Sequence, residues 1–210
     1  MILCDIGNSS INFLEDQKFS SMNVEEFLGF QSEEKIFYIS VNEGLKEHTA
    51  AKRNFINLEP YFQFDTIYSG LGIDRVAACY TVADGVVVDA GSAISVDVIS
   101  NHMHLGGFIL PGLAHYRKTY AEISLRLKCE FNTQISLDAL PQRTVDAVSY
   151  GTFKGIYLLI DNAARNRKLY FTGGDGQFLA NFFDRAIYDK LLVFRGMKKI
   201  IEENSQLLFS

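Results

Sequence analysis

The most distinctive hydrophobic pattern in the chain is a short apolar segment that carries an aspartate at its end, and this pattern occurs twice. Met1–Ile6 and Gly85–Asp89 are apolar runs of strand length, and each leads into a glycine followed by hydroxyl or amide side chains. A second apolar segment then returns, at Ile11–Leu14 and at Ala93–Ser100, and in the latter apolar and polar residues alternate. The pattern predicts two hairpins with one layout, the first at the start of the chain and the second near its middle.

The remaining pattern predicts an α/β protein in which strands and helices alternate. Further strands are predicted at Lys35–Val41, Phe64–Tyr68, Lys168–Phe171 and Leu191–Phe194. Helices are predicted at Leu45–Phe55, Asp74–Val82, Leu113–Leu127, Thr144–Ala164, Gln177–Phe183 and Met197–Leu208. We expect two domains, residues 1–82 and residues 83–210, because each half of the chain supplies one of the hairpins.

Composition and charge exclude several classes of protein. With 48% hydrophobic and 21% charged residues, the 210-residue chain is expected to fold rather than to stay disordered. Its net charge of −5 argues against a broad surface for nucleic acid, so no nucleic-acid partner is expected. No apolar run approaches the ~20 residues that a membrane span requires, so no membrane partner is expected either.

The cysteines and histidines do not have the spacing of a metal site. The three cysteines are far apart in the sequence, which indicates reduced thiols and a cytoplasmic location. His102 and His104 fall in a predicted hairpin turn with no further ligand nearby, so we expect no zinc site there.

The two hairpins have the composition of a phosphate-binding site. Their glycines let the backbone turn tightly, so that N–H groups can point into a concave site, and the hydroxyl and amide side chains add neutral donors. The aspartate at each strand end can hold a cation or its water shell beside the phosphates. An ordinary hairpin turn would explain either copy alone, but two copies, with Thr172–Gly174 after a third strand, favour a polyphosphate clamp. Neither a Walker A loop nor a GxGxxG fingerprint is present.

Five motifs in a fixed order carry a resemblance to a known family. They are Asp5–Ser9, Gly72–Arg75, Asp89–Ala93, Gly106–Gly112 and Thr172–Asp175. In this combination the chain resembles the type III pantothenate kinases, which belong with the acetate and sugar kinases, the heat-shock chaperone ATPases and actin. The family has threonine where this chain has Ser9 and Ser92, and Arg143–Ala147 matches a further family motif only in part.

The resemblance implies a fold and an activity. It implies two ribonuclease H-like domains with an ATP cleft between them, and a homodimer, for which Leu113–Leu127 and Thr144–Ala164 offer candidate apolar faces. It also implies the ATP-dependent phosphorylation of the primary hydroxyl of pantothenate to 4′-phosphopantothenate, the first step of coenzyme A biosynthesis. Magnesium and a monovalent cation, potassium or ammonium, are the implied cofactors.

The resemblance further implies roles for individual residues. Asp74 is expected to accept the proton of the attacking hydroxyl, although an aspartate before a predicted helix can also be an N-cap. Arg75 is expected to bind the pantothenate carboxylate with its two-pronged guanidinium, and Tyr68 is a candidate pocket wall or a core residue. The implied pantothenate-binding residues are Gly72, Ile73, Asp74, Arg75 and Thr144.

The phosphate and metal sites are implied in the same way. Asp5 is expected to orient magnesium through its waters, and Asp89 to hold the monovalent cation. The implied ATP-binding residues are Asp5, Ile6, Gly7, Asn8, Ser9, Ser10, Ile11, Asn12, Gly91, Ser92, Gly173 and Gly174.

Two alternatives stay open on the sequence. The chain could be another small-molecule kinase of the same superfamily, which the Gly72–Arg75 motif speaks against. It could also be a non-catalytic ATP-binding regulator, which the retention of Asp5, Asp74, Arg75 and Asp89 speaks against.

Overall fold

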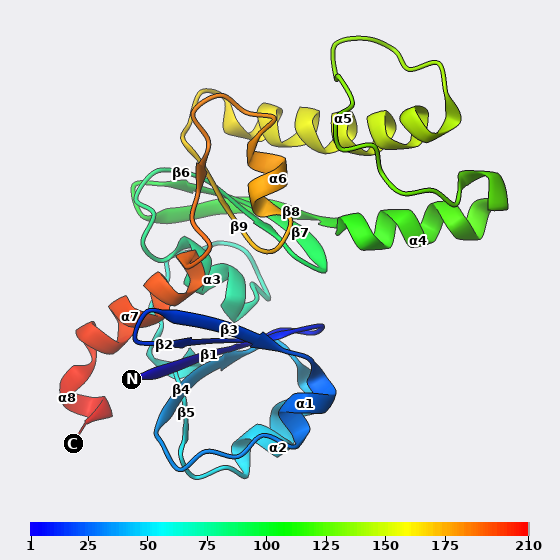
Figure 1. Cartoon of the computed structure of the whole chain (residues 1–210). Helices are drawn as coiled ribbons and strands as arrows, with labels where there is room; N and C mark the ends of the chain where they lie inside the picture. The colour runs from blue at the N-terminus through cyan, green and yellow to red at the C-terminus, as the bar shows by residue number, and fades with distance from the viewer. Residues whose placement is uncertain (210) are drawn as a thin grey trace. The chain divides into compact units, whose positions relative to one another are not determined.

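The chain forms two compact α/β units, each built on a five-stranded sheet. A computed structural model describes residues 1–209 (Figure 1). The first unit comprises Met1–Ala83, Ile99–Gly106 and the C-terminal segment from Leu191 onward. The second comprises Asp84–Val98 and Gly107–Lys190.

The sheet of the first unit has both antiparallel and parallel neighbours. Strands β1 (Ile2–Ile6), β2 (Ile11–Glu15) and β3 (Lys18–Met22) form an antiparallel meander. Strands β4 (Ile36–Ser40) and β5 (Phe55–Asn57) then add in parallel at the other edge of β1, giving the order β3-β2-β1-β4-β5. The central strand β1, which bears Asp5, is thus paired on both sides.

The sheet of the second unit repeats this topology. Its strands are β6 (Gly85–Ala90), β7 (Ala93–Ser100), β8 (Met103–Pro111), β9 (Leu169–Thr172) and β10 (Ile187–Tyr188). Their order is β10-β9-β6-β7-β8, with β9 parallel to β6 and β10 parallel to β9. Read from β8, this order matches that of the first sheet, so the two similar hairpins in the sequence correspond to two copies of one topology.

Helices cover the sheets and bury their apolar sides. The α-helices are α1 (Val24–Leu28), α2 (Lys46–Ala50), α3 (Ile73–Cys79), α4 (Leu113–Ile123), α5 (Thr144–Ala164), α6 (Gly176–Ala180), α7 (Leu192–Glu203) and α8 (Ser205–Leu208). Short 3₁₀ turns occur at Glu43–Leu45, Glu59–Tyr61 and Leu125–Leu127. None of the helices within residues 1–209 combines the length and the apolar composition that crossing a bilayer needs.

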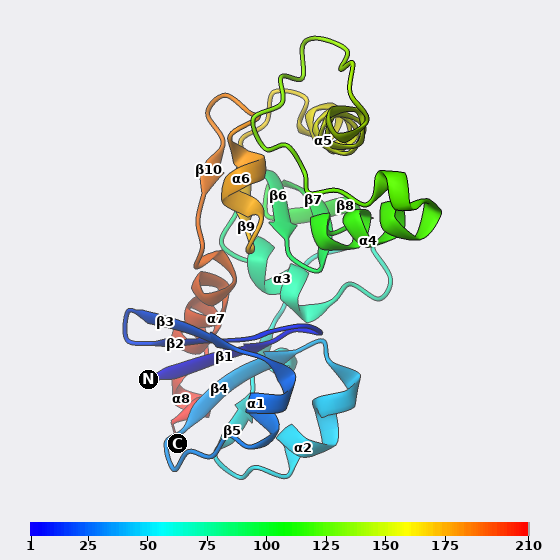
Figure 2. The same cartoon turned by 45° about the vertical axis from the view of Figure 1, so that its right-hand side comes forward.

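The core of the second unit lies between α5 and its sheet (Figure 2). Phe153, Ile156 and Ile160 recur at helical spacing along α5 and are fully buried. They belong to one apolar cluster with Val86 and Val88 of the central strand β6. The α5 helix has the bounds that the apolar periodicity predicts, because one continuous buried face specifies it.

The C-terminal segment packs with the first unit, although the expected division of the chain placed it with the second half. Its helix α7 lies against α3, and a Cβ atom on Gly196 would overlap the backbone of Ala77. Such a close approach of two backbones is possible only at glycine. The division into ribonuclease H-like domains between residues 82 and 83 stays a prediction. The compact units are defined by contacts within the fold, and such contacts do not test where one domain of that type ends and the next begins.

Four local predictions are wrong, and tertiary contacts explain each. The predicted strand Leu191–Phe194 is instead the N-cap and the first turn of α7, and Phe64–Tyr68 is irregular, with only an isolated bridge at Thr66. The helix expected at Leu45–Phe55 ends at Ala50, because Phe55 starts β5 beside β4. His104 lies in β8 and is fully buried, not in a turn.

Candidate active site

The turn between β1 and β2 is a tight, exposed loop. The Gly7 N–H donates to the Ser10 carbonyl at 3.1 Å, which closes the turn, and Asn8–Ser10 are exposed. A Cβ atom on Gly7 would lie only 3.0 Å from that carbonyl oxygen, so a side chain there would press on the turn. Ile6 and Ile11, which flank the loop, are fully buried, so their side chains are closed to a ligand.

Two carboxylates from distant parts of the first unit influence one another. Asp5 is half-buried at the end of β1, opposite Asn12, whose Nδ2 donates to Asp5 Oδ2 at 3.4 Å. Burial and, next, the negative charge of Asp74 raise the pKa of Asp5 to about 7, while the Asn12 amide acts in the opposite direction. The fold therefore brings Asp5 and Asp74 into one electrostatic environment, which the sequence alone does not show.

This environment fits a divalent cation. A bound cation would relieve the repulsion that raises the pKa of Asp5, and the donors are carboxylate oxygens, which magnesium prefers. Within residues 1–209 there is no group of three or more histidine, cysteine, aspartate or glutamate side chains that could hold a metal ion. Magnesium is often held by one or two carboxylates, with phosphates and water completing its shell, and Asp5 is the residue that would orient those waters.

The raised pKa of Asp5 predicts a pH-dependent stability in magnesium-free solution. Because the folded state holds this proton more tightly than the unfolded state, folding stability should fall as pH rises from about 4 to about 7. Asp5→Asn removes this loss, which the shift limits to at most about 4 kcal/mol. Urea unfolding of both proteins at pH 5 and pH 8 measures it. Equal pH dependence in the two proteins would contradict the assignment.

The segment Gly72–Arg75 forms one local unit at the start of α3. The helix begins at Ile73 with Gly72 as its N-cap, so Asp74 lies in the first turn and the N-cap alternative for it is wrong. Asp74 Oδ1 accepts the Arg75 backbone N–H at 2.7 Å. A Cβ atom on Gly72 would lie 2.6 Å from this oxygen, which is too close, so any other residue at this position would displace the Asp74 carboxylate.

Arg75 is held in a nearly buried position. Its side chain is only 6% exposed, and its guanidinium carbon lies 5.0 Å from the centre of the Tyr68 ring. Contact with an aromatic face restricts the orientation of the guanidinium. Tyr68 is therefore a neighbour of the predicted substrate-binding arginine rather than a distant core residue.

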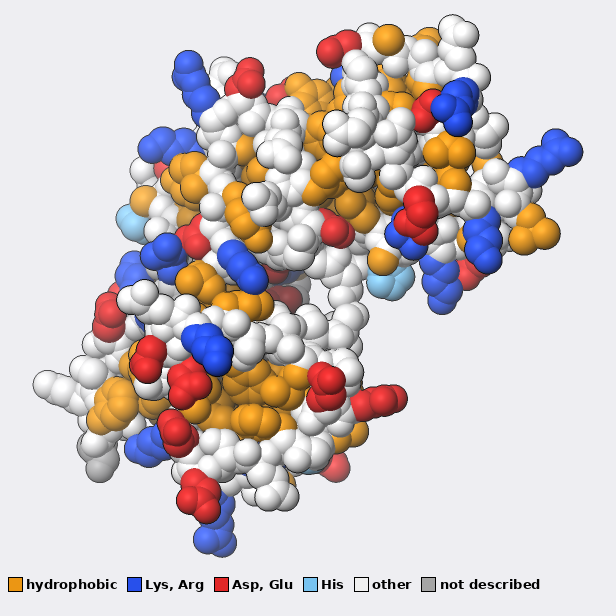
Figure 3. Space-filling view, in the orientation of Figure 1, with side chains coloured by type: hydrophobic (Ala, Val, Ile, Leu, Met, Phe, Trp, Pro, Cys, Tyr) orange, Lys and Arg blue, Asp and Glu red, His pale blue; other side chains and the backbone are white. Residues whose placement is uncertain are grey.

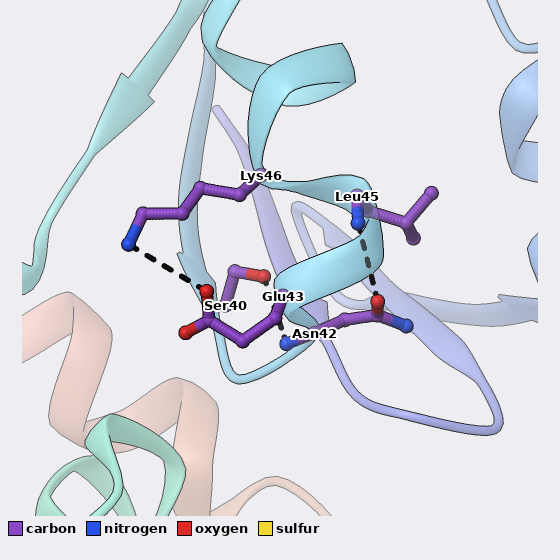
Figure 4. Close-up of polar contacts among 5 residues, drawn as sticks. All are labelled: Ser40, Asn42, Glu43, Leu45 and Lys46. Atoms are coloured by element: carbon purple, nitrogen blue, oxygen red, sulfur yellow. Dashed lines mark hydrogen bonds and ion pairs between the residues drawn. The ribbon is translucent and has the colours of Figure 1, made fainter.

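Asn42 supports the Gly7 turn, and the sequence analysis missed it. The backbone N–H of Asn42 donates to Ser40 Oγ, and its side-chain Oδ1 accepts the Leu45 N–H, both at 3.2 Å (Figure 4). Its Nδ2 donates to the Gly7 carbonyl, also at 3.2 Å. An asparagine between a buried strand and a helical turn is a capping signal that could have drawn attention to it. Figure 4 also shows the ion pair of Glu43 and Lys46, which is exposed and contributes little to stability.

The second unit has a matching turn between β6 and β7. The Gly91 N–H donates to the Ala93 carbonyl at 2.9 Å, and Gly91 and Ser92 are exposed. The Gly112 N–H donates to the Ser92 carbonyl at 3.0 Å. A Cβ atom on Gly112 would overlap the Gly91 carbonyl and lie 2.5 Å from that of Ser92. The last glycine of the Gly106–Gly112 motif thus packs directly against the backbone of this turn and donates a hydrogen bond to it.

Asp89 and Gly173 also lie close together in the second unit. Asp89 on β6 is in register with Thr172 on the parallel strand β9. Gly173 follows with a φ of +83°, and a Cβ atom on it would lie 2.5 Å from both Asp89 Oδ1 and the Ala90 carbonyl. The carboxylate and carbonyl oxygens gathered here are ligands suited to a hard cation.

Thr144 differs from the other predicted residues in its surroundings. It is exposed as the first residue of α5, with Arg143 as the N-cap. Gly174 is likewise exposed, and a Cβ atom placed on it would meet no atom beyond its chain neighbours within 4 Å. Apart from Thr144, the predicted site residues fall in one part of the first unit, with Asp5 and Asp74, and in one part of the second unit, with Asp89 and the Gly91 turn.

Two α/β units with one strand order, each with a glycine turn after its central strand, form a fold that distantly related solved structures share. Solved structures with this fold include the ethanolamine utilization protein EutJ from Carboxydothermus hydrogenoformans, with a TM-score of 0.53 and 15% identity over 93% of this chain and 87% of that one. The activator of a 2-hydroxyisocaproyl-CoA dehydratase from Clostridium difficile, solved with bound ADPNP, has a TM-score of 0.54 and 12% identity over 98% of this chain and 97% of that one. At such identities the likeness shows the fold alone, and it confirms the predicted fold class.

The chain belongs to the type III pantothenate kinase family, whose model matches residues 29–166. A relative of that name from Campylobacter jejuni is 72% identical over the full length of both chains, and one from Wolinella succinogenes is 46% identical over 97% of each. A crystal structure from Campylobacter jejuni, described as a conserved candidate transcriptional activator of the Baf family, has a TM-score of 0.93 and 69% identity over 98% of this chain and all of that one. The chain is thus an ATP-dependent kinase, and the predicted family is confirmed.

Proposed function

We propose that the chain transfers the γ-phosphoryl group of ATP to the primary hydroxyl of pantothenate, the first step of coenzyme A biosynthesis. The observation that carries the proposal is the shared environment of Asp5 and Asp74 in the first unit, with Arg75 next to Asp74. It supports a site in which one carboxylate is suited to a cation, a second carboxylate is coupled to it, and an arginine is the next residue of the same helical turn. Family membership supports pantothenate over a sugar or another acid as the substrate.

At the pantothenate end, Arg75 binds the carboxylate and Asp74 accepts the proton of the attacking hydroxyl. The stacked, nearly buried guanidinium favours bidentate binding, because its direction is fixed before the substrate arrives. Asp74 is held by the backbone N–H of Arg75, so base and carboxylate receptor sit on adjacent residues of one helical turn. Gly72 and Ile73 contribute backbone contacts, and Thr144 a hydroxyl contact, to the same substrate.

At the ATP end, the backbone of the Gly7 turn binds the phosphates, with Asn8 and Ser9 as side-chain donors. Gly91 and Ser92 bind them from the second unit, and Gly173 and Gly174 contact the adenosine. The other residues of the first hairpin with this assignment are Ile6, Ser10, Ile11 and Asn12. Bound magnesium supplies neutralisation of the phosphate charge, and Asp5 holds its waters.

The direct test is a coupled ADP-release assay with ATP, magnesium and potassium. Pantothenate should be turned over, and a panel of sugars and simple hydroxy acids should not. Turnover of another alcohol without turnover of pantothenate would replace the proposed substrate. Binding of ATP with no turnover of any acceptor would favour the regulator alternative.

The same assay tests Asp89 as the residue that holds a monovalent cation. Asp89 Oδ1 and the Ala90 carbonyl oxygen both approach Gly173, and such oxygen ligands suit potassium or ammonium. Potassium or ammonium should therefore activate the wild-type enzyme over sodium, and Asp89→Asn should lose most of this activation. Indifference of the wild type to the cation would remove the assignment.

The proposal includes a homodimer and a cytoplasmic location. The second unit exposes large apolar side chains on the predicted faces, at Ile123, Leu125, Leu158 and Leu159, and Figure 3 shows hydrophobic side chains at the surface of this unit. Pairing of two copies would remove this surface from water. A mass of twice 23.6 kDa in solution would support the dimer. None of the three cysteines is in a disulfide within residues 1–209, which agrees with a reducing compartment.

A further inference from the structure

His104 is a fully buried polar residue in the first unit that the proposed function does not use. It lies in the part of β8 that clusters with this unit, beside the irregular segment before α3. Thr66 forms an isolated parallel bridge with it, and the backbone N–H of His104 donates to the Asp65 carbonyl at 2.9 Å. Burying an imidazole without solvation is costly unless its polar atoms are paired, so the position calls for an explanation.

The side chains of His104 and Thr66 are directly linked. Thr66 Oγ1 lies 2.7 Å from His104 Nδ1, and the same oxygen accepts the Tyr68 backbone N–H at 3.0 Å. One hydroxyl can serve both contacts, because it has one proton to donate and two lone pairs to accept with. The Thr66 hydroxyl therefore ties the backbone of Tyr68 to a buried ring.

Tyr68 in turn contacts Arg75. The Tyr68 ring packs edge-on against the His104 ring, with centroids 5.9 Å apart, and the Arg75 guanidinium stands 5.0 Å from the Tyr68 centroid. Residues 62–72 carry no helix or extended strand, so the hydroxyl link and this ring contact hold Tyr68 where regular structure does not.

We propose that Thr66 and His104 are positioning residues that hold Tyr68 against Arg75 and thereby determine how well the enzyme recognises the substrate carboxylate. The inference rests on the proposed function, which assigns the pantothenate carboxylate to Arg75. A guanidinium free to tilt on its aromatic support loses the bidentate geometry, which weakens carboxylate binding but leaves the phosphoryl-transfer groups in place. The effect should therefore fall on substrate affinity and selectivity rather than on turnover.

The test compares Thr66→Val, which keeps the shape but removes the hydroxyl, with Thr66→Ser, which keeps the hydroxyl. Initial rates are measured with pantothenate and with pantothenyl alcohol, which has a hydroxymethyl group in place of the carboxylate. Thr66→Val should raise the KM for pantothenate about tenfold, an effect of about 1.4 kcal/mol, with kcat and the KM for ATP within about twofold of wild type. The preference for pantothenate over the alcohol should shrink by a similar factor, and Thr66→Ser should restore it.

Two further variants complete the experiment. His104→Phe keeps a planar ring between Phe64 and Tyr68 but lacks Nδ1. It should reproduce the Thr66→Val result. Having two variants keeps the test decisive if one of them fails to fold. Thr49→Val is the control, because Thr49 is another threonine of the first unit whose hydroxyl is hydrogen-bonded, donating to the Leu45 carbonyl at 2.8 Å, and it is more deeply buried than Thr66. It should leave the KM for pantothenate and the selectivity unchanged.

Arg75→Gln separates failure of this inference from failure of the proposed function. If Arg75→Gln abolishes the preference for pantothenate and neither Thr66→Val nor His104→Phe changes it, the positioning role is overturned and the proposed function stands. A wild-type enzyme that uses acid and alcohol equally overturns the Arg75 assignment, and the positioning role falls with it. A shift shared by Thr49→Val would mark a general loss of packing and overturn the positioning role as well.

Discussion

Asp74→Asn is expected to lower kcat by about 10²- to 10⁴-fold, the range that a positioned general base contributes. The asparagine has the same shape and can still accept the Arg75 N–H at its Oδ1, so the local structure should persist. It cannot take a proton from the attacking hydroxyl. ATP binding, measured by calorimetry with magnesium present, should stay within a few-fold of wild type because the glycine turns are untouched.

The matched control for this prediction is Asp16→Asn. Asp16 belongs to the same unit but is exposed, in the turn after β2, where it pairs with the N-terminal amine at 3.5 Å. The same chemical change there should leave turnover unchanged. Near-normal kcat in Asp74→Asn would show that the base is another group or that none is needed, as can happen when phosphoryl transfer has a loose transition state.

Gly112→Ala should have the second-largest effect, through sterics alone. Gly112 has an ordinary φ of −66°, so alanine meets no backbone strain there. Its Cβ atom would nevertheless overlap the Gly91 carbonyl and crowd the Ser92 carbonyl, and neither can turn aside as a flexible side chain could. We expect a loss of stability of about 1–3 kcal/mol. If the Gly91 turn moves by about 1 Å, turnover should fall by about 10²-fold.

Gly29→Ala is the control for the glycine prediction. Gly29 has an α-region φ of −86°, and the nearest atom to a Cβ there would be 3.7 Å away, an ordinary contact. Thermal unfolding and steady-state kinetics of the two variants should therefore differ clearly. If Gly112→Ala has the same unfolding temperature and the same kcat as Gly29→Ala, the Gly91 turn either moves without consequence or does not bind phosphate.

Strong local signals determined several elements from the sequence. The apolar face of α5 recurs over many turns, and its predicted range, Thr144–Ala164, matches the structure at both ends. The alternation of Ala93–Ser100 likewise gave a strand with the observed bounds. The repeated motifs at Asp5 and Asp89 predicted two equivalent hairpins, and the two sheets share one strand order. In each case the information lies within one contiguous segment.

Short apolar runs are ambiguous, and there the tertiary structure decided. Leu191–Phe194 suits a strand or a buried helix equally well by composition, and packing of α7 on α3 through Gly196 makes it helical. The segment Phe64–Tyr68 has the composition of a strand, but its backbone pairing is limited to one isolated bridge between Thr66 and His104. Its side chains instead surround His104.

The sequence by itself determined the family, the α/β class, the two glycine turns and the identity of the charged residues. The tertiary structure decided how those residues influence one another: that Asp74 raises the pKa of Asp5, that Asn42 supports the Gly7 turn, and that Tyr68 lies over Arg75. The physical reason is the separation along the chain of the groups that each effect involves. Turns and helix periodicity depend on neighbours a few residues away, whereas desolvation, charge coupling and ring stacking depend on groups that meet only when the chain has folded.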